Sequence, residues 1–245
     1  PGAIGMAVAD ACRQLRERLT PLAAEVLDCT ETDISYNNGL VHGSAGKSIP
    51  FKELTALAYV SRVQLSAAGF YATPDLEWDW AVGKGKPFHY FAFGAAVSEV
   101  EIDGFTGMHH VRRVDILHDV GDSLNPAVDR GQIEGGFVQG TGWLTSEELK
   151  WNDEGQLLTH SASTYAIPAF SDAPPDFRVS LLTDATQQNT IHGSKAVGEP
   201  PLMLAISVRE AIRDAVNSFR ADNNFLLPSP CTGEAIKMLL DPIQT

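Results

Sequence analysis

Apolar residues recur at helical spacing near the start of the chain, at positions 4, 7, 8, 11, 15 and 19. This spacing predicts a helix over residues 4–19. Two short stretches, 33–36 and 40–42, flank an Asn-Gly turn at positions 38 and 39, which favours a β-hairpin. Residues 51–62 return to helical spacing and predict a second helix.

The next part of the chain favours extended structure. Residues 64–73 and 87–103 are rich in aromatic residues, valine and alanine, and predict strands. A turn at 103–107 and an apolar run at 111–120 predict that the chain returns to complete a long hairpin. Residues 76–80 alternate between apolar and polar types, but the proline and glycines around them indicate loops.

Residues 126–144 predict a helix with an unusual glycine content. Asn125 suits the N-cap and Pro126 the first helical position, where a missing N–H is no loss. The predicted helix contains Gly131, Gly135, Gly136, Gly140 and Gly142. Each interior glycine costs about 0.5–1 kcal/mol relative to alanine. We expect close approach of another backbone or a ligand, or tight helix–helix packing, to explain their presence.

The rest of the chain mixes both element types. Residues 157–161 and 177–182 predict strands, and residues 201–217 and 230–240 predict helices. Residues 168–175 indicate a loop rather than a domain linker. Because strands and helices mix without a clean βαβ alternation, the sequence predicts an α+β fold.

One carboxylate stands in a constrained backbone segment. Glu199 lies between Gly198 and two prolines, Pro200 and Pro201. Pro200 disfavours the α region for Glu199, and both prolines suit the first turn of a helix. We therefore expect Glu199 in an extended conformation on a rigid elbow at a helix N-terminus, where the dipole favours its ionised form. It is either a fixed general base or a carboxylate that caps the helix.

Two further groups of residues carry candidate chemistry. The N–H groups of Ser194, Lys195 and Gly198 approach a helix start and suit an anionic group of a ligand. The Lys195 ammonium suits a phosphate or a protein carboxylate, although an exposed lysine is the usual case. The amide of Gln139 offers a donor and an acceptor, for a cofactor or for buried backbone.

Composition excludes several classes of function. The 245 residues carry a net charge of −13, which argues against nucleic acid as a partner because phosphate binding needs clustered lysine and arginine. No apolar run approaches the roughly 20 residues of a membrane span, and no signal peptide pattern opens the chain. The charged and apolar fractions are ordinary, so we expect a globular protein.

Metal and nucleotide motifs are missing. Cys12, Cys29 and Cys231 are far apart, which indicates reduced thiols in a cytoplasmic protein, with no disulfide framework, zinc site or iron–sulfur cluster. The adjacent His109 and His110 point to opposite faces of a strand, and we expect no metal bound by side chains of this chain. Asp129 and Glu134 do not face each other as a glycosidase pair would, and the glycines do not form a GxGxxG motif.

Several long blocks together resemble one family. They are GFYATP at 69–74, GKPFHYFAFGAAVSEVEIDGFTG at 85–107, DVGDSLNPAVDRGQIEGGFVQGTGWLTSEEL at 119–149, STYAIPAFSDAPPDFRVSLL at 163–182 and KAVGEPPL at 195–202. In this order they resemble the C-terminal region of the molybdopterin-binding part of xanthine dehydrogenases, in the molybdenum hydroxylase family. The resemblance covers about residues 1–220.

The resemblance implies an activity and a role for each candidate. The glutamate of the GEPP block is the catalytic base beside molybdenum in that family, which implies that Glu199 takes the proton of a Mo–OH group. The oxygen would then attack an electron-poor carbon, with hydride passing to a sulfido ligand, as in the hydroxylation of xanthine or hypoxanthine toward urate. The resemblance also places Gln139 near the molybdopterin, with Ser194, Lys195 and Gly198 approaching the cofactor.

The resemblance further implies that the active site is shared. Residues 1–245 correspond to a C-terminal portion of the molybdopterin-binding domain, whose upstream portion would form the opposite wall on a separate chain. FAD and 2Fe-2S clusters are expected in other domains or subunits, and the assembly is expected to be a higher oligomer. A related enzyme acting on an aldehyde or N-heterocycle, or a non-catalytic structural or assembly subunit, remains an alternative. The intact GEPP elbow argues against the second alternative.

Overall fold

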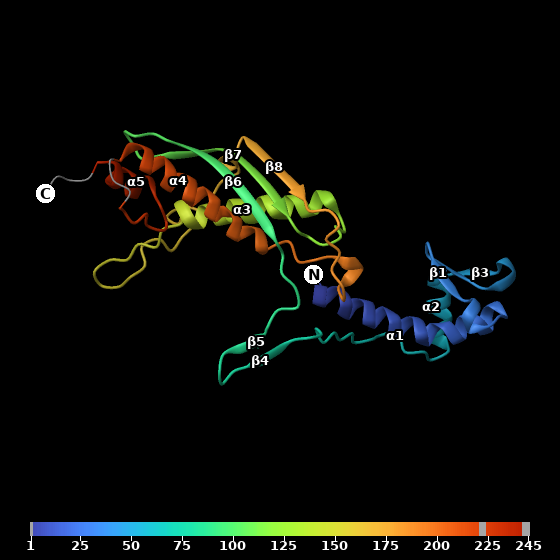
Figure 1. Ribbon diagram of the computed structural model, residues 1–245. Helices are drawn as coiled ribbons and strands as arrows, with labels where there is room; N and C mark the ends of the chain where they lie inside the picture. The colour runs from blue at the N-terminus through green and yellow to red at the C-terminus, as the bar shows by residue number, and fades with distance from the viewer. Residues whose placement is uncertain (1, 221–223, 242–245) are drawn as a thin grey trace. The chain divides into compact units, whose positions relative to one another are not determined.

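The computed structural model describes residues 2–220 and 224–241 and divides into two compact units (Figure 1). Unit 1 is Pro1–His89 with Asn189–Ile191, and unit 2 is Tyr90–Gln188 with His192–Thr245. Each unit has its own buried cluster of apolar side chains. Short 3-10 turns occupy Glu31–Asp33, Ser44–Gly46, Phe170–Asp172 and Ile191–Gly193.

Unit 1 begins with a helix longer than predicted. The helix α1 spans Gly2–Leu27 and passes through Pro21, whereas the sequence predicted an end at residue 19. Proline removes one helical hydrogen bond. The helix nevertheless continues, because Ala23 and Leu27 bury their side chains in the core of unit 1 beyond the proline.

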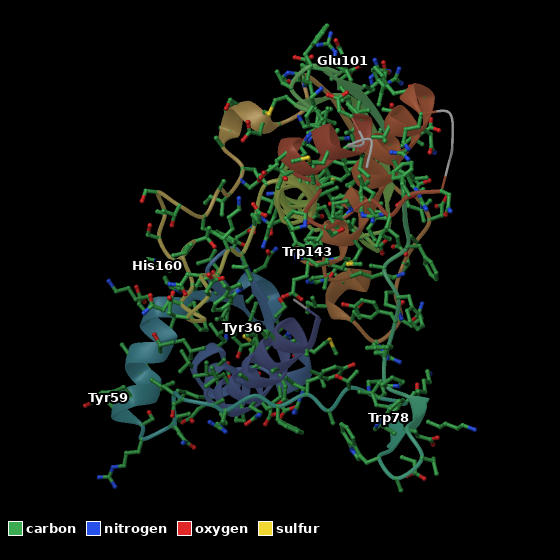
Figure 2. All side chains as sticks on the ribbon, turned by 90° about the vertical axis from the view of Figure 1, so that its left-hand side faces the viewer. Tyr36, Tyr59, Trp78, Glu101, Trp143 and His160 are labelled. Carbon is green, nitrogen blue, oxygen red and sulfur yellow. The ribbon has the colours of Figure 1, made fainter. Side chains whose placement is uncertain are left out.

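The predicted Asn-Gly hairpin is confirmed. The strands β1 (Ser35–Asn37) and β2 (Leu40–His42) pair antiparallel, and Asn38 and Gly39 adopt positive φ at the turn. A third strand, β3 (Ser48–Pro50), extends the sheet and leads into α2 (Phe51–Val60). Residue 54 of α2 packs into the core, whereas Tyr59 is exposed on the outside of this helix (Figure 2).

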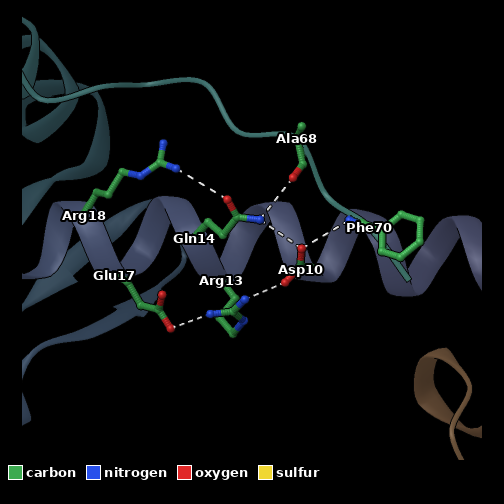
Figure 3. A network of polar contacts seen from close by, with 7 residues as sticks. All are labelled: Asp10, Arg13, Gln14, Glu17, Arg18, Ala68 and Phe70. Carbon is green, nitrogen blue, oxygen red and sulfur yellow. Dashed lines mark hydrogen bonds and ion pairs between the residues drawn. The ribbon is translucent and has the colours of Figure 1, made fainter. Parts of the chain in front are cut away.

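The prediction of a strand over residues 64–73 is wrong. This segment pairs with no strand and instead lies along α1, where polar side chains bind its backbone (Figure 3). Arg18 donates to the Ser66 carbonyl at 2.7 Å and Gln14 to the Ala68 carbonyl at 3.1 Å. The amide of Phe70 donates to Asp10 at 3.2 Å. These bonds satisfy backbone groups that a sheet would otherwise pair.

A small hairpin follows where the sequence indicated loops. The strands β4 (Glu77–Asp79) and β5 (Lys84–Lys86) pair antiparallel across the glycine-containing turn. All six residues of the two strands are exposed. The alternation of residues 76–80 was therefore a signal of extended structure.

Unit 2 contains a three-stranded sheet in the order β6–β7–β8. The long predicted hairpin is confirmed as β6 (Gly94–Ile102) and β7 (His109–His118), although residues 87–93 lie outside the strand. The strand β8 (Asp176–Leu181) pairs parallel to β7.

Two helices cover one face of this sheet. The helix α3 (Pro126–Thr145) connects β7 to β8, and α4 (Ile206–Phe219) packs on β6 and α3 (Figure 1). The connection is a single β–α–β unit, which the mixed element order in the sequence did not reveal. The helix α5 (Gly233–Leu240) packs against α4. The resulting fold is α+β, as predicted.

The capping of α3 matches the prediction, but a later strand does not form. The Asn125 side chain accepts hydrogen bonds from the amides of Ala127 and Val128. At 157–161, only an isolated bridge between Trp151 and Leu157 forms. The hydroxyl of Thr164 accepts from the Ser161 amide, and such side-chain bonds compete with strand pairing. Within the described ranges, every helix is too short or too polar to cross a membrane.

Candidate functional site

The segment before Glu199 is held by the residues that directly follow β7. Gly121 and Ser194 form an antiparallel bridge, and the Lys195 amide donates to the Val120 carbonyl at 2.7 Å. Gly121 has a φ of +65°, and a Cβ there would overlap the carbonyl oxygen of Gly193. Glycine is therefore required for this close approach. Ser194, a predicted cofactor contact, is buried.

A buried ion pair locks the same two segments. Lys195 Nζ lies 2.5 Å from Asp119 Oδ2, and their side chains are 8% and 2% exposed. Nζ also donates to the Phe91 carbonyl at 3.0 Å. Asp119 Oδ1 accepts from the Gly121 amide at 2.9 Å. Of the alternatives for Lys195, the structure shows the pairing with a protein carboxylate.

The following residues are also anchored. The Ala196 amide donates to the Tyr90 hydroxyl at 2.9 Å. Val197 is buried in the core of unit 2, and Pro201 is buried four residues later. Anchors therefore lie on both sides of Glu199.

Glu199 itself is exposed, and its backbone differs from the prediction. Its φ of −100° and ψ of −39° lie in the α region, not the extended region that Pro200 favours. The 3-10 helix η5 (Pro200–Ala205) explains this, because the Leu202 amide donates to the Glu199 carbonyl at 3.1 Å. The α-helix starts only at Ile206.

The side chain of Glu199 does not cap the helix that follows it. The capping interpretation of this residue is therefore wrong. An exposed carboxylate on an anchored backbone remains available to another group.

Four of the five glycines of α3 divide into two sets, and at the fifth, Gly142, an added Cβ would overlap the Pro168 ring. A Cβ at Gly136 would lie 3.2 Å from the Gly198 carbonyl oxygen, and one at Gly140 would overlap that of Leu202. Close approach of another backbone is thus confirmed at these two positions. Gly131 and Gly135 face open space, because nothing beyond the adjacent residues and the backbone of their own helix lies within 4 Å of an added Cβ. Packing within the described chain does not explain them.

The helix α3 presents two glutamine amides, of which sequence reasoning named one. Gln139 is exposed on α3. Gln132 was missed, although its Oε1 lies 3.3 Å from where a Cβ of Gly198 would be. Its position one turn before Gly136 was the available signal, because residues four apart share a helix face. The amide of Gln132 therefore lies directly beside the elbow.

Within residues 2–220 and 224–241, no three His, Cys, Asp or Glu side chains gather as a metal site. His109 is partly buried and His110 exposed, on opposite faces of β7 as expected. Burial raises the pKa of the Cys231 thiol to about 11, so this group stays protonated.

Comparison with known proteins identifies the family. Residues 2–174 match the molybdopterin cofactor-binding domain family. The chain belongs to this family. The matched range ends before the elbow, so it includes Gln132 and Gln139 but not Lys195 or Glu199.

Similarity to whole proteins extends across the elbow. A xanthine dehydrogenase of Oryza sativa subsp. japonica is 46% identical over 96% of this chain. One from Dictyostelium discoideum is 48% identical over 95%. The chain spans 16% of the length of each of these relatives.

Solved structures share the fold of this molybdopterin cofactor-binding chain. Quinoline 2-oxidoreductase from Pseudomonas putida 86 is 27% identical and superposes with a TM-score of 0.68, covering 93% of this chain and 28% of that one. CO dehydrogenase from Oligotropha carboxidovorans is 22% identical with a TM-score of 0.70, covering 96% and 28%. The second likeness concerns the fold alone.

Proposed function

We propose that this chain supplies the base-bearing wall of the active site in a xanthine dehydrogenase-type molybdenum hydroxylase. The proposed reaction is the hydroxylation of xanthine or hypoxanthine toward urate. The observation that carries the proposal is the exposed carboxylate of Glu199 on a backbone anchored from both sides. The similarity to xanthine dehydrogenases across the elbow supports it.

The residues around the elbow fit a molybdopterin cofactor. Gly198 is exposed, and a Cβ there would meet only Gln132 Oε1 within 4 Å. Gly135 leaves further open space on α3. Gln132 and Gln139 offer amide donors and acceptors, which match the hydrogen-bonding edge of a pterin. Glycines without side chains let a planar ring approach the backbone closely.

Each candidate residue then has a defined task in the proposed site. When bound, the cofactor supplies a redox-active, Lewis-acidic metal. Glu199 accepts a proton at its carboxylate, which must lie within hydrogen-bond reach of the reacting group. Gln132 and Gln139 orient the pterin. The backbone of Gly198 and Ser194 borders the cofactor, while Lys195 contacts Asp119 rather than an exposed anion.

The rest of the site belongs to the remainder of the protein or to other chains. We propose that an upstream molybdenum-subunit portion forms the opposite wall, and that 2Fe-2S and FAD modules carry electrons away. The chain spans 16% of its xanthine dehydrogenase relatives, which supports this division. The assembly is proposed to be a cytoplasmic higher oligomer that acts in purine catabolism.

Replacing the base tests the proposal. In the assembled enzyme, Glu199→Gln keeps the size of the side chain but removes the proton acceptor. Turnover of xanthine per molybdenum should fall by roughly 10²–10⁴-fold, with molybdenum content nearly unchanged. Glu154→Gln, at another exposed glutamate, should have no effect and serves as the matched control. A Glu199→Gln enzyme that keeps about a third of the wild-type rate would refute the assignment.

A second substrate class is favoured by one specific observation. The quinoline 2-oxidoreductase structure is similar in fold and more than a quarter identical, at 27%. The same base on the same elbow would serve a related N-heterocycle or an aldehyde. Turnover of xanthine, quinoline and a simple aldehyde by one preparation separates these alternatives.

A further inference from the structure

We propose that Lys195 and Asp119 are positioning residues that hold the Glu199 backbone in register with the active site. The inference rests on the proposed role of Glu199 as the base. It assigns the buried ion pair to the rate of the reaction and not to the stability of the fold. Neither residue is proposed to contact substrate.

The pair is placed at the junction of three segments. Asp119 directly follows β7, and its amide donates to the Phe93 carbonyl at 2.8 Å. Lys195 Nζ reaches Asp119 and the Phe91 carbonyl, and so ties the segment before β6 to the elbow. Nζ also lies 5.6 Å from the ring centroid of Phe93 and 5.9 Å from that of Tyr90. The ammonium is therefore held by two oxygen acceptors and lies near two aromatic rings.

The connection from the pair to Glu199 has little slack. Lys195 and Glu199 are four residues apart in the sequence. Between them, the Ala196 amide is bonded to Tyr90, the Val197 side chain is buried, and Gly198 lies against α3. Pro200 and Pro201 then fix two φ angles. A shift of Lys195 is therefore transmitted along the backbone to the carboxylate.

Stability alone is a weak reason for such a pair. Removing two charges from water offsets most of their attraction, and well-packed apolar residues of similar volume are often as stabilising. The geometry instead gives a directional link, with three hydrogen bonds that share the two charged groups. A general base requires this kind of precision, because a displacement of about 1 Å can reduce a rate by about 10²-fold.

The test uses the assembled enzyme and a double variant, Lys195→Met with Asp119→Asn, in which the asparagine Oδ1 still accepts from the Gly121 amide. The single variant Lys195→Met leaves a buried carboxylate without its partner and is expected to impair folding. The double variant removes both charges and should keep the wild-type unfolding midpoint and molybdenum content. Its kcat should fall by about 10²-fold, while KM changes by less than about threefold.

A second measurement does not depend on activity. Hydrogen exchange of the peptide covering 193–202 should speed up in the double variant, with exchange in α4 unchanged. Tyr90→Phe removes only the hydroxyl that accepts from Ala196. This variant should lower kcat by about tenfold through the same loop, without a change in the unfolding midpoint.

Three outcomes overturn the inference. A double variant with wild-type kcat shows that the pair does not position the base. A double variant with a lower unfolding midpoint or a lower molybdenum content than the wild-type enzyme shows that the pair is structural. Unchanged exchange at 193–202 shows that the pair does not hold the loop. Activity retained by Glu199→Gln would instead refute the proposed function itself, so the two failures are distinguishable.

Discussion

Two glycines of α3, Gly135 and Gly140, lie in opposite surroundings although they belong to the same helix. An added Cβ at Gly140 would overlap the Leu202 carbonyl and crowd Ala205, whereas one at Gly135 would meet nothing within 4 Å beyond the adjacent residues and the backbone of its own helix. The sequence alone could not separate them, because each carries the same helix-propensity cost. Only the position of η5 distinguishes a glycine that packs against another backbone from one that faces open space.

Alanine substitutions should separate these roles. In the assembled enzyme, Gly140→Ala should reduce the free energy of unfolding by about 1–3 kcal/mol, because the backbone of η5 must move. Gly135→Ala should increase it by about 0.5–1 kcal/mol, through helix propensity. Urea unfolding monitored by circular dichroism measures both. If Gly140→Ala is as stable as Gly135→Ala, the contact with Leu202 has no energetic role.

The molybdopterin content of the assembled enzyme tests separately whether the space at Gly135 receives the cofactor. Gly135→Leu should lower molybdopterin content if the open space on α3 receives the cofactor, even though leucine is the better helix former. Cofactor released by denaturation is quantified by its fluorescence. Full cofactor content together with a more stable protein would contradict this use of the space.

At the scale of elements, structure that depends on adjacent residues could be predicted from the sequence, whereas structure that depends on distant partners could not. Asn125 and the Asn38–Gly39 turn were predictable because their geometry depends on adjacent residues. The segment 64–73 was not, because its hydrogen-bond partners lie on α1, more than 40 residues earlier. The pairing of Lys195 with Asp119 joins positions 76 apart, so no sequence window contains both residues.

The contact between 64–73 and α1 depends on Gly69. A Cβ there would overlap the backbone carbonyl of Ala7. Gly69→Val should therefore displace the segment and increase its proteolysis at low protease concentration. Ser66→Ala is the control, because Arg18 binds the backbone carbonyl of residue 66 and not its side chain. Equal cleavage of the two variants would show that the segment is not held at Gly69.

The strand β7 makes stability depend on pH. Burial lowers the pKa of His118 and of His109 below their ordinary value of 6.5. As pH falls below 6.5, the unfolded chain binds protons first, so the free energy of unfolding should decrease until the folded pKa values are reached. Thermal unfolding from pH 7.5 to pH 5 measures this trend.

His118→Leu tests the contribution of His118 to this effect. Nδ1 of His118 is buried and has no hydrogen-bond partner among the described residues. The variant should flatten the pH dependence and keep or raise stability at low pH. A pH dependence as steep as that of the wild-type chain would exclude His118 as its source.

At the scale of the whole molecule, large apolar side chains remain uncovered. Phe170 is 99% exposed, Phe105 91% and Trp80 89%. The outer face of β6 also exposes Val97. Exposed apolar patches mark interaction sites or aggregation hazards. These exposed side chains agree with the proposal that the chain works against a larger remainder of its protein.

Expression tests this dependence. The chain alone should aggregate and carry little molybdopterin, and coexpression with the upstream molybdenum-subunit portion should restore solubility and cofactor content. Size-exclusion chromatography and molybdenum analysis measure both quantities. A soluble monomer of the chain alone, with stoichiometric molybdopterin and xanthine turnover, would overturn the shared-site proposal.

The return of Asn189–Ile191 to unit 1 has a consequence for biosynthesis. The Tyr71 hydroxyl donates to the Asn189 carbonyl at 2.7 Å, and Ile191 packs against Gly5. The ribosome must therefore add roughly 100 residues after His89 before unit 1 has all its parts, which takes roughly 5–20 s at typical rates of synthesis. Unit 1 therefore lacks residues 189–191 during the time in which β6, β7 and α3 are synthesised. A chain truncated after His89 would never receive them.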